Sequence, residues 1–127
     1  SGISFPQTGC QSPVPILAFH GTADRTVPFE PALVFGLLPY FGARAGIASW
    51  AEFDGCTGGT TATRLSEHVT RESTDGCGKN DVELVVVEGG SHTWPGTPVS
   101  VRRAGDVTQE VSAANLMWSF FAAHPKG

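Results

Sequence analysis

Two short apolar runs stand out along the chain, and turn-forming residues follow each of them. Residues 13–19 are almost entirely apolar and end at a His-Gly pair, while residues 82–88 are rich in valine and end at a Gly-Gly pair. Runs of this length, bounded by turn residues, are typical of strands that are buried on both faces. The pattern therefore predicts two strands of a parallel sheet.

Helical spacing is found in two segments. In residues 108–124 apolar side chains recur at every third or fourth position and Pro125 follows, which predicts an amphipathic C-terminal helix. A shorter helix is predicted over residues 43–54, because apolar residues again have helical spacing and a glycine follows. The apolar residues on these two helices are Ile47, Trp50, Ala51, Ala113, Leu116, Met117, Phe120 and Phe121. Trp50 and Trp118 have apolar neighbours on these helices, so we expect both in the core.

The segments between these elements have weaker patterns. Residues 22–31 are predicted to form a loop, and Pro39 prevents a single long helix over residues 32–42. Residues 65–71 fit an exposed antiparallel strand only loosely, with His68 facing solvent. The main order is strand, helix, strand, helix, which favours an α/β fold.

Composition excludes several classes of function. The chain has 127 residues, 40% of them hydrophobic, which is enough for the core of one small domain. Its net charge is −4 and its basic residues are scattered, so nucleic acid is not an expected partner. No apolar run approaches the ~20 residues of a membrane span. The three cysteines and four histidines lack the spacing of a zinc site, so no metal is expected.

The two predicted strands lead to an acid and a histidine. Asp24 lies five residues after Phe19, and His92 lies four residues after Glu88. Loops at the carboxyl ends of neighbouring parallel strands lie at one edge of the sheet, where ligands bind. An acid that orients a histidine acting as general base forms part of a catalytic triad, and in α/β-hydrolases the acid precedes the histidine in the sequence.

These segments resemble a known family of enzymes. Residues 20–29 (HGTADRTVPF) and 90–96 (GSHTWPG), with Cys56 and Cys77 between them, are similar to the C-terminal portion of secreted polyhydroxybutyrate-depolymerase-like esterases, which include feruloyl and acetylxylan esterases. The resemblance extends over roughly residues 13–121. It implies an extracellular α/β-hydrolase with parallel strands and flanking helices, in which Asp24 is the triad acid, His92 the triad base, and the two cysteines a pair.

The nucleophile of such an enzyme is missing. No serine in the chain has the G-x-S-x-G environment of a nucleophile elbow, and nothing supplies oxyanion-hole donors beside one. We therefore expect residues 1–127 to be the C-terminal segment of one α/β-hydrolase domain, whose N-terminal half carries the serine and a partner for Cys10. The implied substrates are feruloyl or acetyl esters of polysaccharides, or polyhydroxyalkanoate esters, and no cofactor is required.

Each of these residues also has a structural interpretation. Asp24 could cap its own turn, His92 could bond to backbone at a strand end, and Trp94 could be structural filler rather than a wall of an acyl pocket. His20 is expected to pack beneath the Asp24 loop, and a metal site of His20, Asp24 and His92 is not favoured because an activating glutamate motif is absent.

Two further alternatives concern the cysteines and the whole chain. Cys56 and Cys77 both lie in glycine-containing turns, where a disulfide closing about 20 residues would contribute ~3 kcal/mol. The alternative is two free thiols in a reducing compartment. The chain itself could be a non-catalytic binding or interaction module derived from a hydrolase. Separately, His124 is expected to stabilise the C-terminal end of its helix.

Overall fold

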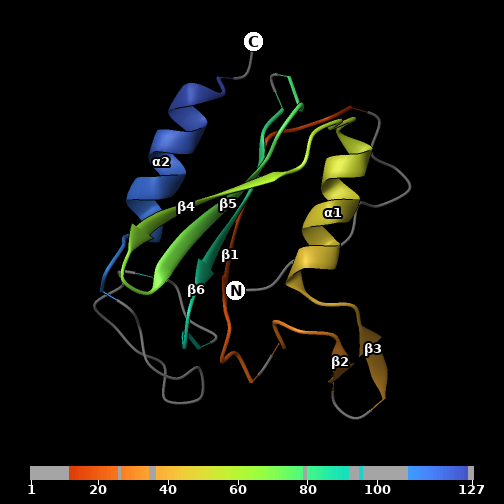
Figure 1. Ribbon diagram of the computed structural model, residues 1–127, viewed down its shortest axis with the longest axis vertical. Coiled ribbons are helices and arrows are strands. Elements are labelled where there is room, and N and C mark those ends of the chain that lie inside the picture. Colours follow the sequence, from red (N-terminus) through yellow and green to blue (C-terminus); the bar gives the residue numbers. More distant parts are fainter. Residues whose placement is uncertain are drawn as a thin grey trace.

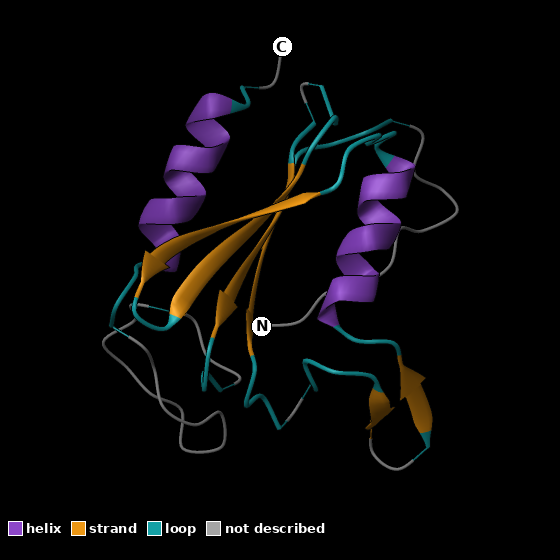
Figure 2. Ribbon diagram, viewed as in Figure 1, coloured by secondary structure: helices purple, strands orange, loops and turns teal. Residues whose placement is uncertain are grey.

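The computed structural model describes residues 12–25, 27–34, 37–78, 80–91, 95 and 109–125 (Figure 1). Within these residues a four-stranded sheet lies between two helices, and a separate pair of short strands lies below the N-terminal end of α1 (Figure 2). The elements are β1 (Ile16–Gly21), β2 (Ala32–Val34), β3 (Leu38–Tyr40), α1 (Ala43–Phe53), β4 (Thr60–Ser66), β5 (Val69–Thr74), β6 (Val82–Val87) and α2 (Ala113–Ala123).

The main sheet is mixed rather than parallel. Its strand order is β1-β6-β5-β4, in which β1 and β6 are parallel while the β6–β5 and β5–β4 pairs are antiparallel. The predicted fold class, part of an α/β-hydrolase with parallel strands, is therefore wrong. The physical reason lies at residues 67–68, which form a two-residue turn between β4 and β5. A turn this short can only join antiparallel neighbours, because a parallel connection needs a crossover of a dozen or more residues.

The predicted strand over residues 65–71 was centred on this turn. Its residues belong to the end of β4, the turn itself and the start of β5. His68 therefore lies in a turn, where its Nδ1 is 3.1 Å from the Glu110 Oε2. Its side chain is half exposed, as predicted, but it lies in a turn and not on a strand.

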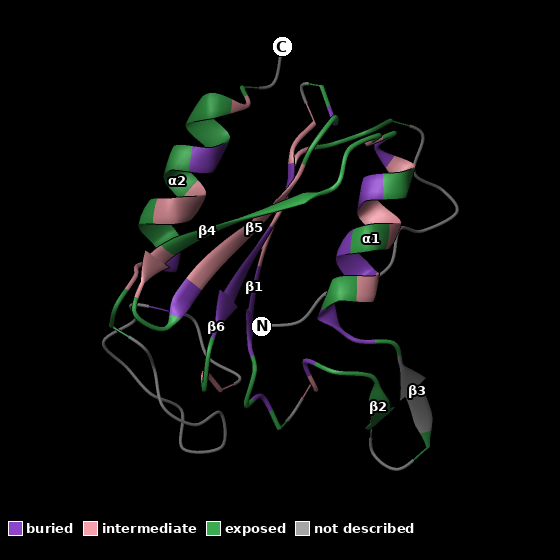
Figure 3. Ribbon diagram, in the orientation of Figure 1, coloured by how far each residue is buried: buried purple, intermediate pink, exposed green. Residues whose placement is uncertain are grey.

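Strand β6 is the centre of the core, as its run of apolar residues predicts. Because side chains alternate along a strand, Leu84 points to the face covered by α1 and Val85 to the face covered by α2; both are 1% exposed. Figure 3 shows β6 as the most deeply buried strand, with a helix on each side of the sheet. The cluster beneath α1 consists of Phe29, Ala43, Ile47, Ala51, Cys77, Val82, Leu84 and Val86. The cluster beneath α2 consists of Phe19, Val69, Val85, Val87 and Ala113.

Both predicted helices are present. Helix α2 begins after Ser112, whose side chain accepts a hydrogen bond from the Asn115 backbone N–H, as expected of an N-cap. Only a narrow stripe of α2 is deeply buried, at Ala113 and Phe120. Trp118 lies on the opposite side of the helix and is 76% exposed, so its assignment to the core was wrong. Trp50 is partly buried and packs against the cluster beneath α1.

A disulfide joins Cys56 to Cys77, which confirms the predicted pairing. It links the segment after α1 to the segment after β5, beside backbone hydrogen bonds from Gly58 N–H to the Asp75 carbonyl and from Asp75 N–H to the Gly59 carbonyl. Cys10 lies outside the described residues. The bridge is compatible with an oxidising environment. Neither helix in the described ranges has the length and apolar character needed to cross a bilayer.

Candidate functional site

The segments that follow β1 and β6 are bound to one another. The Thr22 N–H donates to the Val87 carbonyl (3.0 Å), and the Ala23 N–H donates to the Gly90 carbonyl (2.9 Å). In return, the Gly89 N–H donates to the Thr22 hydroxyl oxygen at 2.7 Å. These bonds place the residue before Asp24 in contact with a residue two positions before His92. The parallel pairing of β1 with β6 is the cause, since it brings both strand ends to one edge of the sheet.

Glycine at position 21 allows this close approach. A Cβ built on Gly21 would overlap the carbonyl group of Gly90, which is backbone and has no room to withdraw. Gly89 has a φ of 71°, in the left-handed region that glycine adopts without strain. The glycines that end both apolar runs therefore have a structural purpose at the junction of the two segments.

Asp24 is buried at this junction. Its side chain is fully buried, and its Oδ1 accepts a hydrogen bond from the Val27 N–H at 2.8 Å. An aspartate that only caps its own turn would make this same contact. The contact also fixes the orientation of the carboxylate, which is what a triad acid requires. The two roles are therefore compatible.

His20 lies beneath the same loop, as the sequence predicts. Its ring is completely buried, packs edge-on against Phe29, and donates from Nε2 to the Val27 carbonyl at 2.8 Å. The Nε2 is 3.7 Å from the Oδ2 of Asp24. Because Val27 is bonded to both side chains, His20 and Asp24 together hold the loop in shape.

His92 and Trp94 lie outside the described residues, so the predicted contact between His92 and Asp24 stays a prediction. The residues on either side of them are nevertheless anchored. Gly90 is bonded to Ala23, and the Pro95 carbonyl accepts a hydrogen bond from the Ala113 N–H at 2.9 Å. Gly90 is thus attached to the Asp24 loop, and Pro95 to the first turn of α2.

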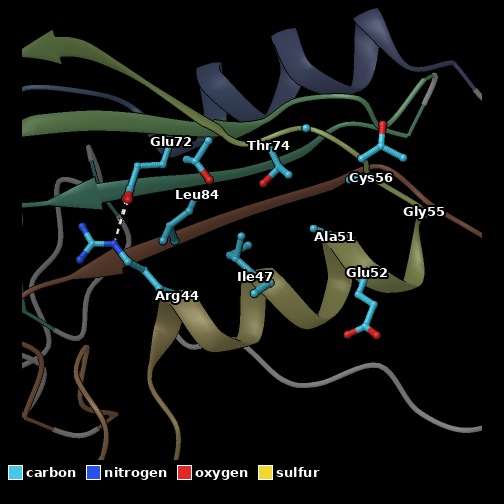
Figure 4. A pocket seen from close by; sticks show the side chains of 13 residues that line it. Arg44, Ile47, Ala51, Glu52, Gly55, Cys56, Glu72, Thr74 and Leu84 are labelled. Atoms are coloured by element: carbon cyan, nitrogen blue, oxygen red, sulfur yellow. Dashed lines mark hydrogen bonds and ion pairs between the residues drawn. The ribbon is translucent and has the colours of Figure 1, made fainter.

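Two hollows lie on the face of the sheet beneath α1. The first, with a volume of about 550 Å³, lies between α1 and strands β4 to β6 (Figure 4). The second, of about 530 Å³, extends to Thr22 and Glu88, at the carboxyl ends of β1 and β6. Arg44 and Glu72 line both hollows. The second hollow therefore reaches the residues that directly follow β1 and β6.

The ion pair between Arg44 and Glu72, which line both hollows, was not predicted from the sequence. The Arg44 Nε lies 2.8 Å from the Glu72 Oε1, and its guanidinium is 5.0 Å from the centroid of the Phe29 ring. The hydrogen bond to Glu72 raises the pKa of Arg44 above its ordinary value, against the lowering effect of burial. No sequence signal links the two residues, because they lie 28 positions apart in a helix and a strand whose contact depends on tertiary structure.

Within the described residues no three histidine, cysteine or carboxylate side chains come together in a way that would hold a metal ion. The chain matches no known protein family, and no curated protein shows significant similarity to it.

Proposed function

We propose that this chain supplies the acid and the base of a serine carboxylesterase. Asp24 orients the imidazole of His92, and His92 acts as general base toward a serine that lies outside these 127 residues. The observation that carries this proposal is the set of hydrogen bonds between the segments after β1 and β6, which places Ala23 against Gly90. His92 is two residues from that contact and Asp24 is one residue from it.

The proposed reaction follows from these roles. His92 accepts the serine proton as the oxygen attacks the ester carbonyl, and then gives that proton to the leaving alcohol. In the second half-reaction His92 takes a proton from water as the water oxygen attacks the acyl-enzyme carbonyl, and returns that proton to the serine oxygen as the bond to the acyl group breaks and the carboxylic acid leaves. Asp24 holds the imidazole in the required tautomer and stabilises the imidazolium that forms in each half-reaction.

The proposed substrates and partners come from the family resemblance. They are feruloyl or acetyl esters of polysaccharides, or polyhydroxyalkanoate esters, and the partner is an N-terminal half that contributes the serine and the oxyanion hole. The disulfide supports an extracellular location, because such bridges persist in oxidising compartments.

His20 is a poor alternative base. Its Nε2 lies 3.7 Å from the Asp24 Oδ2, but this nitrogen already donates to the Val27 carbonyl. Its ring is also 0% exposed, so an ester could not approach it without opening of the loop. A general base must come within hydrogen-bond distance of the proton that it removes. His92, on the adjacent segment, is the better candidate.

The 127 residues alone are expected to show no turnover of an aryl ester, because an acid and a base without a nucleophile and an oxyanion hole form no acyl-enzyme. A chromogenic acetate assay at high protein concentration measures this directly. Turnover blocked stoichiometrically by an organophosphate, with the label on a serine of this chain, would contradict the proposal that the nucleophile lies elsewhere.

The contact between Asp24 and His92 is testable in this chain by NMR. With ¹⁵N-labelled protein, we expect an Nδ1 proton of His92 that exchanges slowly because it is hydrogen-bonded to a carboxylate, and we expect Asp24→Asn to weaken or abolish that signal. Asp54→Asn is a matched control, because Asp54 is also buried but accepts its hydrogen bond from the Val14 N–H instead. An unchanged His92 signal in Asp24→Asn would show that these residues are not coupled.

A second candidate function, a non-catalytic interaction module, is favoured by one observation. Leu33, Leu37 and Phe41, in and around the β2–β3 pair, are 63%, 83% and 60% exposed. Exposed apolar side chains grouped in this way are typical of surfaces that contact another protein. The length of the natural gene product distinguishes the candidates: a longer product with a nucleophile elbow supports the esterase, and a 127-residue product supports the module.

A further inference from the structure

Both ring nitrogens of His124, at the end of α2, face hydrogen-bond acceptors. The Nδ1 is 2.7 Å from the Phe120 carbonyl oxygen, and the Nε2 is 2.7 Å from the Oδ2 of Asp81. A carbonyl oxygen and a carboxylate oxygen accept hydrogen bonds, so each contact requires a proton on the histidine nitrogen. Only the doubly protonated imidazolium has both protons, since neutral histidine has one donor and one acceptor.

The surroundings of His124 also favour its positive charge. Among the described residues, three with charged side chains line the hollow of about 240 Å³ that His124 faces between α2 and the sheet: Asp81 before β6, Glu83 on β6 and Arg71 on β5. Glu83 accepts a hydrogen bond from the Ser73 hydroxyl, and Asp81 is the direct partner of His124. Two carboxylates thus face the imidazole and oppose the single guanidinium. The Phe120 ring packs against the imidazole, with centroids 4.4 Å apart.

We propose that His124 is a pH-sensitive latch, which when protonated holds the C-terminal turn of α2 against the start of β6. Loss of one proton removes the positive charge that pairs with Asp81. It also leaves one ring nitrogen without a proton, so that either the contact with Asp81 or the contact with the Phe120 carbonyl becomes an acceptor facing an acceptor. The other end of α2 is bound to Pro95 beyond His92, so the helix spans the distance between the latch and the candidate catalytic segment. This inference does not depend on the proposed esterase function.

The direction of the pH dependence follows from the folded environment. Burial alone would lower the pKa of His124, but the Phe120 carbonyl, Asp81 and Glu83 together raise the pKa above its ordinary value. A group whose pKa is raised by folding stabilises the folded state fully below its unfolded pKa, about 6.5 for histidine. That contribution is lost as the pH rises through the higher folded value.

Amide hydrogen exchange and histidine NMR test the latch in the full chain. We expect His124 to titrate above the ordinary histidine value. The amides in the last turn of α2 should open roughly tenfold more at alkaline pH than at pH 5.5, after correction for intrinsic exchange, as loss of a hydrogen bond to a charged group implies. His124→Gln and Asp81→Asn should both remove this difference, while the amides of α1 serve as an internal reference.

His68→Gln is the matched control variant. His68 also pairs with a carboxylate, Glu110, but through Nδ1, and it is 52% exposed. Its replacement should leave exchange at the end of α2 unchanged. A titration of His124 at or below the ordinary histidine value, or exchange in α2 that does not depend on pH, would overturn the latch. The wild-type measurements decide the matter even if the variants fold poorly.

Discussion

In the proposed esterase, which would also contain the serine, Asp24→Asn is expected to lower kcat by about 10⁴-fold and His92→Ala by at least as much, the effects typical of triad members. Asparagine at position 24 keeps an oxygen that accepts the Val27 hydrogen bond, so the loop retains its shape. What it loses is the negative charge that stabilises an imidazolium. Steady-state kinetics on an aryl ester, with thermal unfolding measured in parallel, separate this loss from a loss of folding.

Two further variants sharpen this experiment. Asp54→Asn removes the charge of another buried carboxylate, at the end of α1, and should leave kcat near that of the wild type. Asp24→Ala removes the turn hydrogen bond as well as the charge, so it should lower the stability more than Asp24→Asn does. Near-normal activity in His92→Ala would assign the base to another residue, with His20 the next to test.

Removal of the disulfide is expected to have the largest effect on stability. The double variant Cys56→Ala/Cys77→Ala should lose about 3 kcal/mol of unfolding free energy, the amount expected when a bridge closes a loop of this length. That is a large fraction of the ~5–15 kcal/mol that stabilises a typical domain. Urea denaturation with and without reductant measures the loss in the wild type, and the double variant should no longer respond to reductant.

Cys10→Ala is the control for this measurement. It leaves the observed bridge intact, so its denaturation midpoint should still fall when reductant is added. A wild-type midpoint that reductant does not change would contradict the expected contribution of the bridge. Non-reducing peptide mapping that joined Cys10 to Cys56 or Cys77 would contradict the pairing itself.

The elements that could be predicted from the sequence are those whose burial is nearly complete. Strand β6 is buried on both faces because a helix covers each side of it, and this produces a continuous apolar run over residues 84–87. Strand β4 has the opposite character: its residues from Thr60 to Arg64 are all exposed, so no hydrophobic pattern marks them. The antiparallel β4–β5 pair was therefore missed, and with it the mixed sheet.

The residues of the candidate site could also be predicted only in part. Asp24 could be named as a candidate because it follows a patterned strand and lies in a recognisable segment, and its role as triad acid stays a prediction. The Arg44–Glu72 pair could not be named, because each residue looks like an ordinary surface charge until α1 is placed over β5. Trp118 shows the converse error, since a large apolar side chain on an amphipathic helix was assumed to be buried. In both cases the deciding information is which elements are neighbours in space.

The strand order also has a consequence for how the chain folds. Strands β4, β5 and β6 follow one another in the sequence and pair as antiparallel neighbours. Strand β1 instead pairs with β6, the last of the described strands in the sequence, so that Ile16 lies opposite Val82. Closing a longer loop costs more chain entropy, so the β4–β5–β6 meander should form before β1 joins it. The segments that carry Asp24 and His92 thus meet only in this late pairing, and a partly folded chain would keep its antiparallel strands without a candidate site.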